Sequence, residues 1–318
     1  MGKKTASQLM MFCTALIWGF AFVAQRAGMD HVGPFTFNAA RNYIACIFLG
    51  VLARPLRAAG ISGEIPLSRG TEGFAPHGKP APESRASTRV GGLVCGLILF
   101  GGSTLQQFGI VYTTVSNASF ITTLYIVLVP ILGLALGKRT RPSVCAAAAL
   151  AALGLYLMCV PAGGALSLGR GDLLVLLCAF LFSAHILAID HFSPKADGIA
   201  MSRIQFLTAA ALSTACMFLF ETPTVESLLA CWWPILYAGV LSSGVGYTLQ
   251  ILGQRNTPPA VASLILSLES VFGALFGFLL LSEMFTARGL SGMALMFFAT
   301  ILAQIPVGRG WPLKANAD

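Results

Sequence analysis

The sequence predicts an all-α, polytopic membrane protein in which ten transmembrane helices form two inverted five-helix repeats. The first observation is composition: 56% of the residues are hydrophobic, only 10% are charged, and the mean hydropathy is +0.79. Soluble domains carry about 25% charged residues, so this chain has too little polar surface for water. The other two observations are a series of ten apolar segments and an internal duplication.

The ten segments follow one another along the chain, and Pro or Gly marks several of the loops between them. A stretch of roughly 20 apolar residues can cross a bilayer, because a helix satisfies its own backbone hydrogen bonds there. The first segment follows Lys3 and Lys4 and could mimic a signal peptide, but cleavage would destroy the repeat. The predicted spans are 9–24, 37–52, 90–112, 117–136, 143–160, 172–189, 204–220, 234–253, 259–281 and 289–305.

The duplication has one offset, 144 residues, across two spans and their connecting loop. Thr104-Leu105-Gln106 recurs as Thr248-Leu249-Gln250, and the identities continue from Gly109, Thr113, Leu124 and Gly133 to Gly253, Thr257, Leu268 and Gly277. The predicted repeats are residues 1–165 and 166–318. Each holds five spans, an odd number, so the second copy must enter the membrane from the opposite side. Inverted repeats are typical of secondary transporters, which bind substrate near the midplane between the halves.

Residues 54–89 form a long hydrophilic segment that is rich in Gly, Pro, Ser and Arg and has no apolar periodicity. This composition predicts a flexible cytoplasmic loop inserted in the first repeat. Before the loop, residues 15–19 match 179–183 at an offset of 164, and after it the offset is 144. Both a tolerated insertion and a regulatory or partner-binding arm are open interpretations.

Basic residues in the loops predict the orientation. With the N-terminus inside, sixteen Lys and Arg residues fall on the cytoplasmic side, Arg26, Arg170 and Arg288 fall on the other side, and Arg41 lies within a span. This bias places both termini in the cytoplasm, at the cell (inner or plasma) membrane. The cytoplasmic set is Lys3, Lys4, Arg54, Arg57, Arg69, Lys79, Arg85, Arg89, Lys138, Arg139, Arg141, Lys195, Arg203, Arg255, Arg309 and Lys314.

Several of the spans carry short motifs. They are residues 15–22 (Ala-Leu-Ile-Trp-Gly-Phe-Ala-Phe), Asn117-Ala118-Ser119-Phe120, Pro130, Gly171-Asp172-Leu173-Leu174, and Ala262-Ser263-Leu264 followed by Glu269, Gly277 and Glu283. Together they resemble the EamA-type transporters of the drug/metabolite transporter superfamily. The resemblance implies a permease that exports amino acids or other small metabolites, and related branches carry nucleotide sugars. The chain departs from the family at Arg139, where an acidic residue often matches Glu283.

Glu269 is the first candidate for a transport role. An ionisable side chain at the centre of a membrane helix costs roughly 2.5–3.5 kcal/mol, so it usually faces a cavity or a partner. Glu269 lies near the middle of the ninth span, and its repeat counterpart is Tyr125, a polar group at the same depth. The carboxyl group either binds a proton or a cationic substrate in a central cavity, or is protonated and bonded to a neighbouring helix.

Two other ionisable residues lie within spans. His185 is deep in the sixth span, where an imidazole suits proton exchange, and a structural hydrogen bond is the alternative. Arg41 lies near the outer end of the second span, where snorkelling to the surface is the favoured interpretation and anion binding the alternative. A membrane enzyme would need such groups to converge at one depth, and Glu269, His185 and Arg41 are predicted several turns apart. We therefore do not expect an enzyme.

Polar and aromatic residues complete the predicted substrate-binding set. Gln106 and Gln250 are repeat counterparts, and Tyr247 is close to Gln250 in sequence. Amides and hydroxyls can orient a small polar substrate, or can bond neighbouring helices at around 0.6 kcal/mol each. Trp18 and Tyr125 can stack on an apolar or aromatic substrate, or can simply pack.

Other site types are not predicted. The eight Cys residues show no C-x-x-C spacing, so we expect no metal site, disulfide framework or cofactor. The net charge of +8 comes from loops and not from one basic face, so we expect no nucleic-acid partner. Gly92-x-x-x-Gly96 and Gly273-x-x-x-Gly277 predict close helix packing, within the chain or in a homodimer.

The predicted function is therefore that of an inner-membrane secondary transporter that exports a small-molecule substrate by alternating access, with proton coupling. Its predicted partners are this substrate and the lipid bilayer. Two alternatives stay open: a non-transporting receptor or scaffold that uses residues 54–89, and a nucleotide-sugar-type exchanger.

Overall fold

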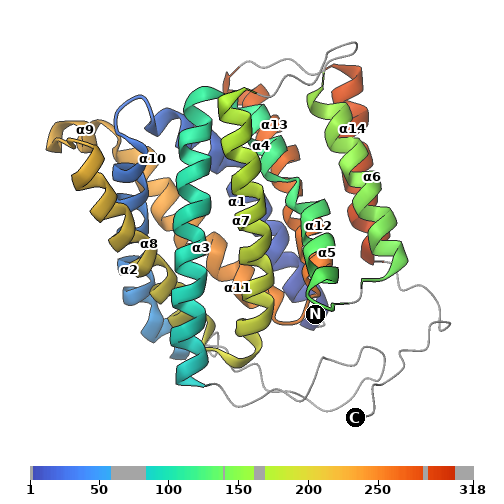
Figure 1. Cartoon of the computed structure of the whole chain (residues 1–318), viewed down its shortest axis with the longest axis horizontal. Coiled ribbons are helices and arrows are strands. Elements are labelled where there is room, and N and C mark those ends of the chain that lie inside the picture. Colours follow the sequence, from blue (N-terminus) through green and yellow to red (C-terminus); the bar gives the residue numbers. More distant parts are fainter. Residues whose placement is uncertain (1–2, 59–83, 139, 161–168, 282–285, 305–318) are drawn as a thin grey trace.

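The computed structural model describes residues 3–58, 84–138, 140–160, 169–281 and 286–304, and the regular elements in these ranges are all helices. Figure 1 shows them standing side by side between two faces of the molecule. They are α1 (Lys3–Gly28), α2 (Pro34–Ala58), α3 (Arg85–Tyr112), α4 (Val115–Thr122), α5 (Tyr125–Ala135), α6 (Pro142–Cys159), α7 (Arg170–Phe192), η1 (Ser193–Lys195), α8 (Gly198–Phe220), α9 (Val225–Ala230), α10 (Trp232–Leu236), η2 (Tyr237–Tyr247), α11 (Thr248–Gln254), α12 (Pro259–Leu266), α13 (Leu268–Leu281) and α14 (Ala287–Gln304).

Eight helical runs in the described ranges are long and apolar enough to cross a membrane, and two shorter apolar helices, Pro142–Leu157 and Ala287–Ala303, accompany them. Large apolar side chains cover the outward surfaces of these runs; Ile47, Val51 and Leu97, for example, are more than half exposed. Such surface suits lipid and not water. The eight runs are Lys4–Gly28, Pro34–Ala53, Arg85–Tyr112, Val115–Ala135, Arg170–Lys195, Gly198–Phe220, Trp232–Gln254 and Pro259–Leu280.

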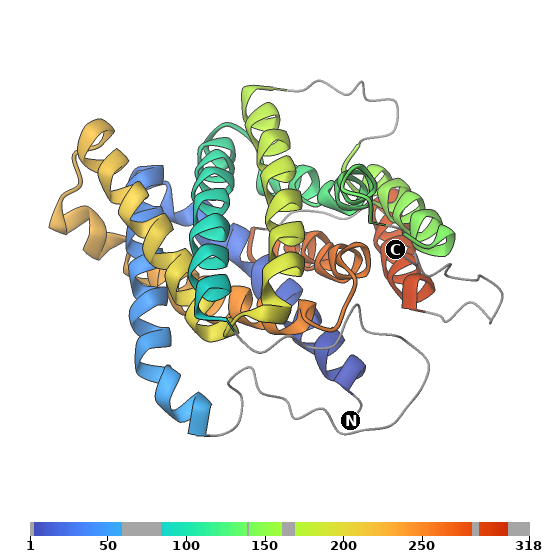
Figure 2. The ribbon, with the colours of Figure 1, turned by 60° about the horizontal axis from the view of Figure 1, so that its bottom comes forward.

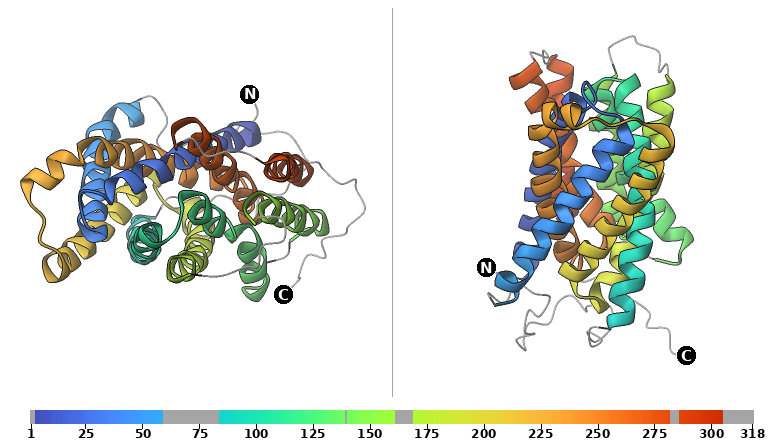
Figure 3. Two further views of the ribbon diagram at one scale, coloured as in Figure 1. Left: turned by 90° about the horizontal axis from the view of Figure 1, so that it is seen from above. Right: turned by 90° about the vertical axis from the view of Figure 1, so that its left-hand side faces the viewer.

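The helices pack in a fixed pattern around the centre. α3 lies between α7 and α8, α2 packs on α8, α1 packs on α13 and α11, and α6 packs on α14 at one end of the molecule (Figures 2 and 3). Close approach at Gly92 and Gly96 sets the contact of α3 with α8, because a Cβ atom at either glycine would lie 2.6 Å from Ile204 or Thr208. The Gly92-x-x-x-Gly96 motif therefore joins two helices of the same chain.

Two faces can be told apart by their loop contacts. At the amino-terminal face, Asn256 donates to Ser7 and the Asp197 backbone N–H donates to Thr88. At the opposite face, the Glu221 carboxylate accepts from the N–H groups of Phe35 and Thr36 and so caps the free N-terminus of α2.

The structure alters some predicted boundaries. α2 continues to Ala58 and α3 begins at Arg85, so helix extends into both ends of the loop predicted over 54–89, and residues 59–83 lie outside the described part. Ser84 explains the early start of α3, because its side chain accepts from the Ser87 N–H as an N-cap.

Three spans that were predicted as continuous helices are divided. The span 117–136 becomes α4 and α5, the span 259–281 becomes α12 and α13, and the span 234–253 contains the π-helical segment η2. These three interruptions lie around the centre of the molecule, where they shape the site described next.

Candidate functional site

A small cavity of about 30 Å³ lies at the centre of the helices, and the seven residues predicted to bind substrate all line it. They are Trp18, Gln106, Tyr125, His185, Tyr247, Gln250 and Glu269. The rest of its wall is Ala21, Phe22, Gln25, Arg41, Thr122, Phe182, Ile186 and Ser242. The site thus draws on residues from both halves of the chain, and it combines charged, amide, hydroxyl and aromatic groups.

Glu269 and Tyr125 meet directly in this cavity. The Tyr125 hydroxyl donates to Glu269 Oε1 at 3.0 Å, and the two residues are 144 positions apart. Both side chains are at least 97% buried. Glu269 lies in the first turn of α13 and Tyr125 begins α5, so each follows directly on the division of a predicted span.

A hydroxyl side chain bonds the backbone at each of these two divisions. Thr123 Oγ1 donates to the Phe120 carbonyl at 2.8 Å, and Ser267 Oγ donates to the Leu264 carbonyl at 2.9 Å. A hydroxyl bonded to its own helix competes with the backbone hydrogen bonds and often bends the helix. In each half the bend places a new helix N-terminus, which favours negative charge, at the cavity wall.

Arg41 lies in the same cavity, on α2. Its side chain is only 3% exposed, Nη1 donates to Gln25 Oε1 at 3.2 Å, and Cζ lies 5.9 Å from the Phe37 ring centroid. The prediction that Arg41 snorkels to the surface is therefore wrong. Although the sequence separated Arg41, His185 and Glu269 by several turns, all three line one cavity.

A signal in the sequence could have identified this inward orientation. Asn38, Arg41 and Asn42 have the i, i+3, i+4 spacing of one helix face, and all three are buried. A face with three polar groups is expected to turn away from lipid, because lipid offers them no hydrogen bonds.

His185 forms a second polar contact, on the α7 side of the cavity. Its Nε2 lies 3.1 Å from Gln205 Oε1, and its ring stands edge-on to Tyr247 at a centroid distance of 5.7 Å. Gln205 is fully buried on α8. Its position is 164 residues after Arg41, the offset that relates the early parts of the two halves.

The π-helical segment η2 supplies backbone acceptors to α1. Trp18 Nε1 donates to the Ser242 carbonyl at 3.1 Å, and Thr14 Oγ1 donates to the Gly246 carbonyl at 3.1 Å. A π-helix pairs its backbone differently from an α-helix and often occurs at functional sites. The Trp18 ring also lies 4.6 Å from the Tyr247 ring, so indole and phenol together form one wall.

The two repeat-related amides differ in their contacts. Gln106 Nε2 donates to Thr122 Oγ1 at 3.2 Å, so Gln106 both lines the cavity and joins α3 to α4. Gln250 Oε1 is buried and has no hydrogen-bond partner among the described residues. An unpaired buried amide oxygen is costly unless a ligand or water satisfies it.

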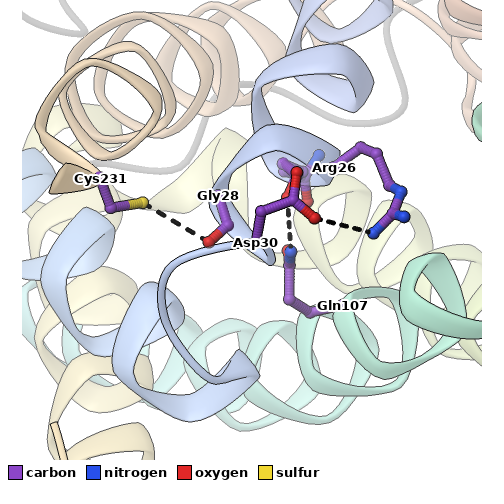
Figure 4. Close-up of polar contacts among 6 residues, drawn as sticks. Arg26, Gly28, Asp30, Gln107 and Cys231 are labelled. Carbon is purple, nitrogen blue, oxygen red and sulfur yellow. Dashed lines mark hydrogen bonds and ion pairs between the residues drawn. The ribbon is translucent and has the colours of Figure 1, made fainter. Parts of the chain in front are cut away.

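The contacts beside the cavity hold α1 in place (Figure 4). Gln107 reaches α1 from α3 and donates from Nε2 to the Gln25 carbonyl at 3.2 Å. Cys231 Sγ lies 3.6 Å from the Gly28 carbonyl, and Arg26 pairs with Asp30 at 3.6 Å. Gln107 and Cys231 thus join the end of α1 to neighbouring elements, whereas the exposed Arg26–Asp30 pair lies at the end of α1 itself.

Comparison with known proteins identifies the family. The model of the EamA-like transporter family matches residues 5–160 and, separately, residues 169–304. The chain belongs to the EamA-like transporter family. It is thus a multi-pass membrane protein of a transporter family, as the sequence predicted.

Two curated relatives are similar to the chain over most of their length, and one solved structure is similar in fold. Two proteins of Archaeoglobus fulgidus (strain ATCC 49558 / DSM 4304 / JCM 9628 / NBRC 100126 / VC-16), each named an uncharacterized transporter, are 29% and 26% identical to the chain. The matches cover 96% and 91% of this chain and 88% and 94% of the relatives. A solved crystal structure of a protein superposes with a TM-score of 0.72 over 94% of this chain and 96% of its own, at 20% identity. This likeness concerns the fold alone.

Proposed function

We propose that the protein exports a small polar metabolite, such as the amino acids that the family resemblance implies, by alternating access and in exchange for protons. The main support for this proposal is the central cavity, in which buried Glu269 accepts a hydrogen bond from Tyr125 among the predicted binding residues. A cavity of about 30 Å³ has room for roughly two water molecules. The helices must therefore move apart to admit a metabolite, as alternating access requires.

The proposed architecture is ten spans in two inverted five-helix repeats, residues 1–165 and 166–318. The separate matches of the family model to the two halves support it. Glycine contacts support it as well. A Cβ atom on Gly102 would lie 3.1 Å from the Phe182 ring, and one on Gly246 would lie 2.7 Å from the Trp18 indole. The glycines are 144 apart and their aromatic partners 164 apart, the two offsets found in the sequence.

The bond between Tyr125 and Glu269 fits the same two-fold relation. Two equivalent residues of a two-fold pair can touch only beside the axis, and these two touch in the cavity. Likewise, α2 packs on its proposed counterpart α8, and α6 packs on α14. These contacts support a substrate site at the interface of the repeats, where inverted-repeat transporters bind substrate.

Glu269 is the proposed site of coupling. A buried carboxylate is costly inside the membrane without a proton or a cationic partner. Glu269 would hold either a proton or the cationic group of the substrate, so the entry of one would release the other. His185, bonded to Gln205 in the same cavity, is the second proposed proton site.

The proposed orientation places both termini in the cytoplasm of a cell whose inner or plasma membrane holds the protein. Its support is the excess of loop Lys and Arg on the amino-terminal side, including Lys138, Lys195 and Arg255. Export then runs from the amino-terminal face of the structure to the face that carries Glu221.

Proteoliposomes test the proposal. Purified protein would be reconstituted around a pH-sensitive dye, and alanine, leucine, phenylalanine, putrescine and UDP-glucose would each be supplied on one side. We expect substrate-driven proton movement that Glu269→Gln abolishes and His185→Ala reduces. Transport with unaltered pH dependence in both variants would refute the coupling, and no flux of any compound would refute transport of these classes.

A further inference from the structure

Arg41 brings a positive charge to the cavity, and no described residue provides a counter-charge bonded to it. Its Nη1 donates to the neutral Gln25 side chain, and its Nε has no hydrogen-bond partner among the described residues. Within those residues, no carboxylate pairs with Arg41. An arginine stays protonated in proteins, and a buried charge without a counter-ion is unfavourable. The cavity would therefore gain from a ligand that brings an anionic group to this side.

Glu269 provides the opposite charge in the same cavity. Its carboxylate accepts from Tyr125, and the structure shows no ion pair between Glu269 and Arg41 in the described part of the chain. Tyr247 lines the cavity wall together with both groups. The cavity thus holds one basic and one acidic side chain that do not bond each other in the described part of the chain.

We propose that Arg41 recognises the carboxylate of a zwitterionic substrate while Glu269 receives its ammonium group. The planar guanidinium fork matches a carboxylate in geometry, and Gln25 holds the fork on the cavity side of α2. The proposal rests on the proposed function, because it assigns the charges of the transported molecule.

This arrangement predicts which molecules the site rejects. An amine without a carboxylate leaves Arg41 unbalanced and adds a second positive charge. An acid without an amine leaves Glu269 without a cationic partner and adds a second negative charge. A nucleotide sugar brings two negatively charged phosphates toward the Glu269 carboxylate. Unpaired buried charges give strong discrimination between ligands. Arg41 is therefore a specificity-determining residue that selects net-neutral zwitterions.

Matched ligands can test this selection. The melting temperature of the purified, detergent-solubilised protein would be titrated with alanine, leucine and phenylalanine, each as the free amino acid, the amide and the N-acetyl derivative. A ligand that binds the folded state raises the apparent stability. We expect at least one free amino acid to bind at least tenfold more tightly than its amide and its N-acetyl derivative.

Variants separate recognition by Arg41 from a merely structural role. Arg41→Gln should weaken the affinity for the free amino acid at least tenfold and leave the affinity for the amide unchanged. Arg41→Lys should restore part of the affinity for the free amino acid. The control is Arg203→Gln, which removes an exposed arginine of α8 outside the cavity and should leave all affinities unchanged. Elution volume and unliganded melting temperature check that each variant folds, and Arg41→Lys carries the test if Arg41→Gln does not fold.

Several outcomes would overturn the proposal. In the first, the wild-type protein binds an amide as tightly as the corresponding free amino acid. In the second, Arg41→Gln weakens the binding of both equally. In the third, none of the nine compounds binds. Flux of putrescine or UDP-glucose in the proteoliposomes, together with a blank titration, would overturn the zwitterion proposal and leave transport standing. No flux of any compound would overturn both.

Discussion

The two divided helices, α4–α5 and α12–α13, share one backbone design but present different chemistry to the cavity. Thr123 and Ser267 each donate to the carbonyl three residues earlier, and 144 positions separate the two hydroxyls and the two acceptors alike. Just beyond the bend, the first half has Tyr125 and the second has Glu269. The bend is therefore common to both halves, and the side chain that follows it differs between them.

The difference between Tyr125 and Glu269 gives the largest expected effect. Glu269→Tyr should lower transport about 100-fold, equivalent to about 2.7 kcal/mol, because the cavity loses its carboxylate. The double variant Glu269→Tyr with Tyr125→Glu returns the carboxylate to the equivalent position and should recover at least part of the flux. Initial rates in proteoliposomes measure both. A double variant as inactive as the single one would show that the two positions are not equivalent.

Gly246 and Gly102 compare the two halves at their aromatic neighbours. Gly246→Ala should lower the unfolding free energy by about 1–3 kcal/mol, the cost of overpacking, because its new Cβ would lie 2.7 Å from an indole held by the Ser242 carbonyl. Gly102→Ala meets the Phe182 ring at 3.1 Å and should cost less. Melting temperatures in one detergent measure the difference. Equal losses of stability in the two variants would contradict the closer packing at Gly246 than at Gly102.

Tyr125→Phe removes the bond between the two halves and keeps the ring. The lost hydrogen bond is worth about 1 kcal/mol, so transport should fall roughly fivefold. Tyr43→Phe is the control, because Tyr43 is partly exposed on α2 and lies outside the cavity. An unchanged rate in Tyr125→Phe would mean that this bond does not position Glu269 for transport.

The smallest expected effect concerns the bends. Thr123→Val and Ser267→Ala should each change the unfolding free energy by about 0.6 kcal/mol, the average for a hydrogen bond inside a membrane protein, and both should reduce flux by straightening the helix. Thr208→Val is the control, because Thr208 bonds the Ile204 carbonyl within the undivided helix α8. If the control lowers flux as much as the other two, the bends have no special part in transport.

Much of the candidate site was predictable because the duplication places equivalent residues at equivalent depths. Gln106 with Gln250, and Tyr125 with Glu269, were selected as repeat partners, and both pairs line the cavity. The wrong prediction for Arg41 follows from its distance to the helix end, which does not report the helix face on which the side chain lies. Its polar neighbours Asn38 and Asn42 mark that face.

The interruptions of the helices were not predictable from hydropathy. The mean hydropathy stays high across Thr123, Ser267 and the π-helical segment, so composition shows a single span in each case. A serine or threonine in a membrane helix either bonds its own backbone or bonds a neighbour, and this choice depends on which helix lies opposite. The same holds for Trp18, whose indole is bonded only because η2 brings the Ser242 carbonyl to it.

By itself, the sequence determined that the chain is a helical membrane protein of duplicated pattern, with polar residues at matching depths in its spans. These properties follow from composition and periodicity, which are local. Only the tertiary structure decided that Tyr125 bonds Glu269 and that one cavity gathers Arg41, His185 and Glu269. Helix rotation and helix partners set those contacts, and both result from the packing of segments that lie more than a hundred residues apart.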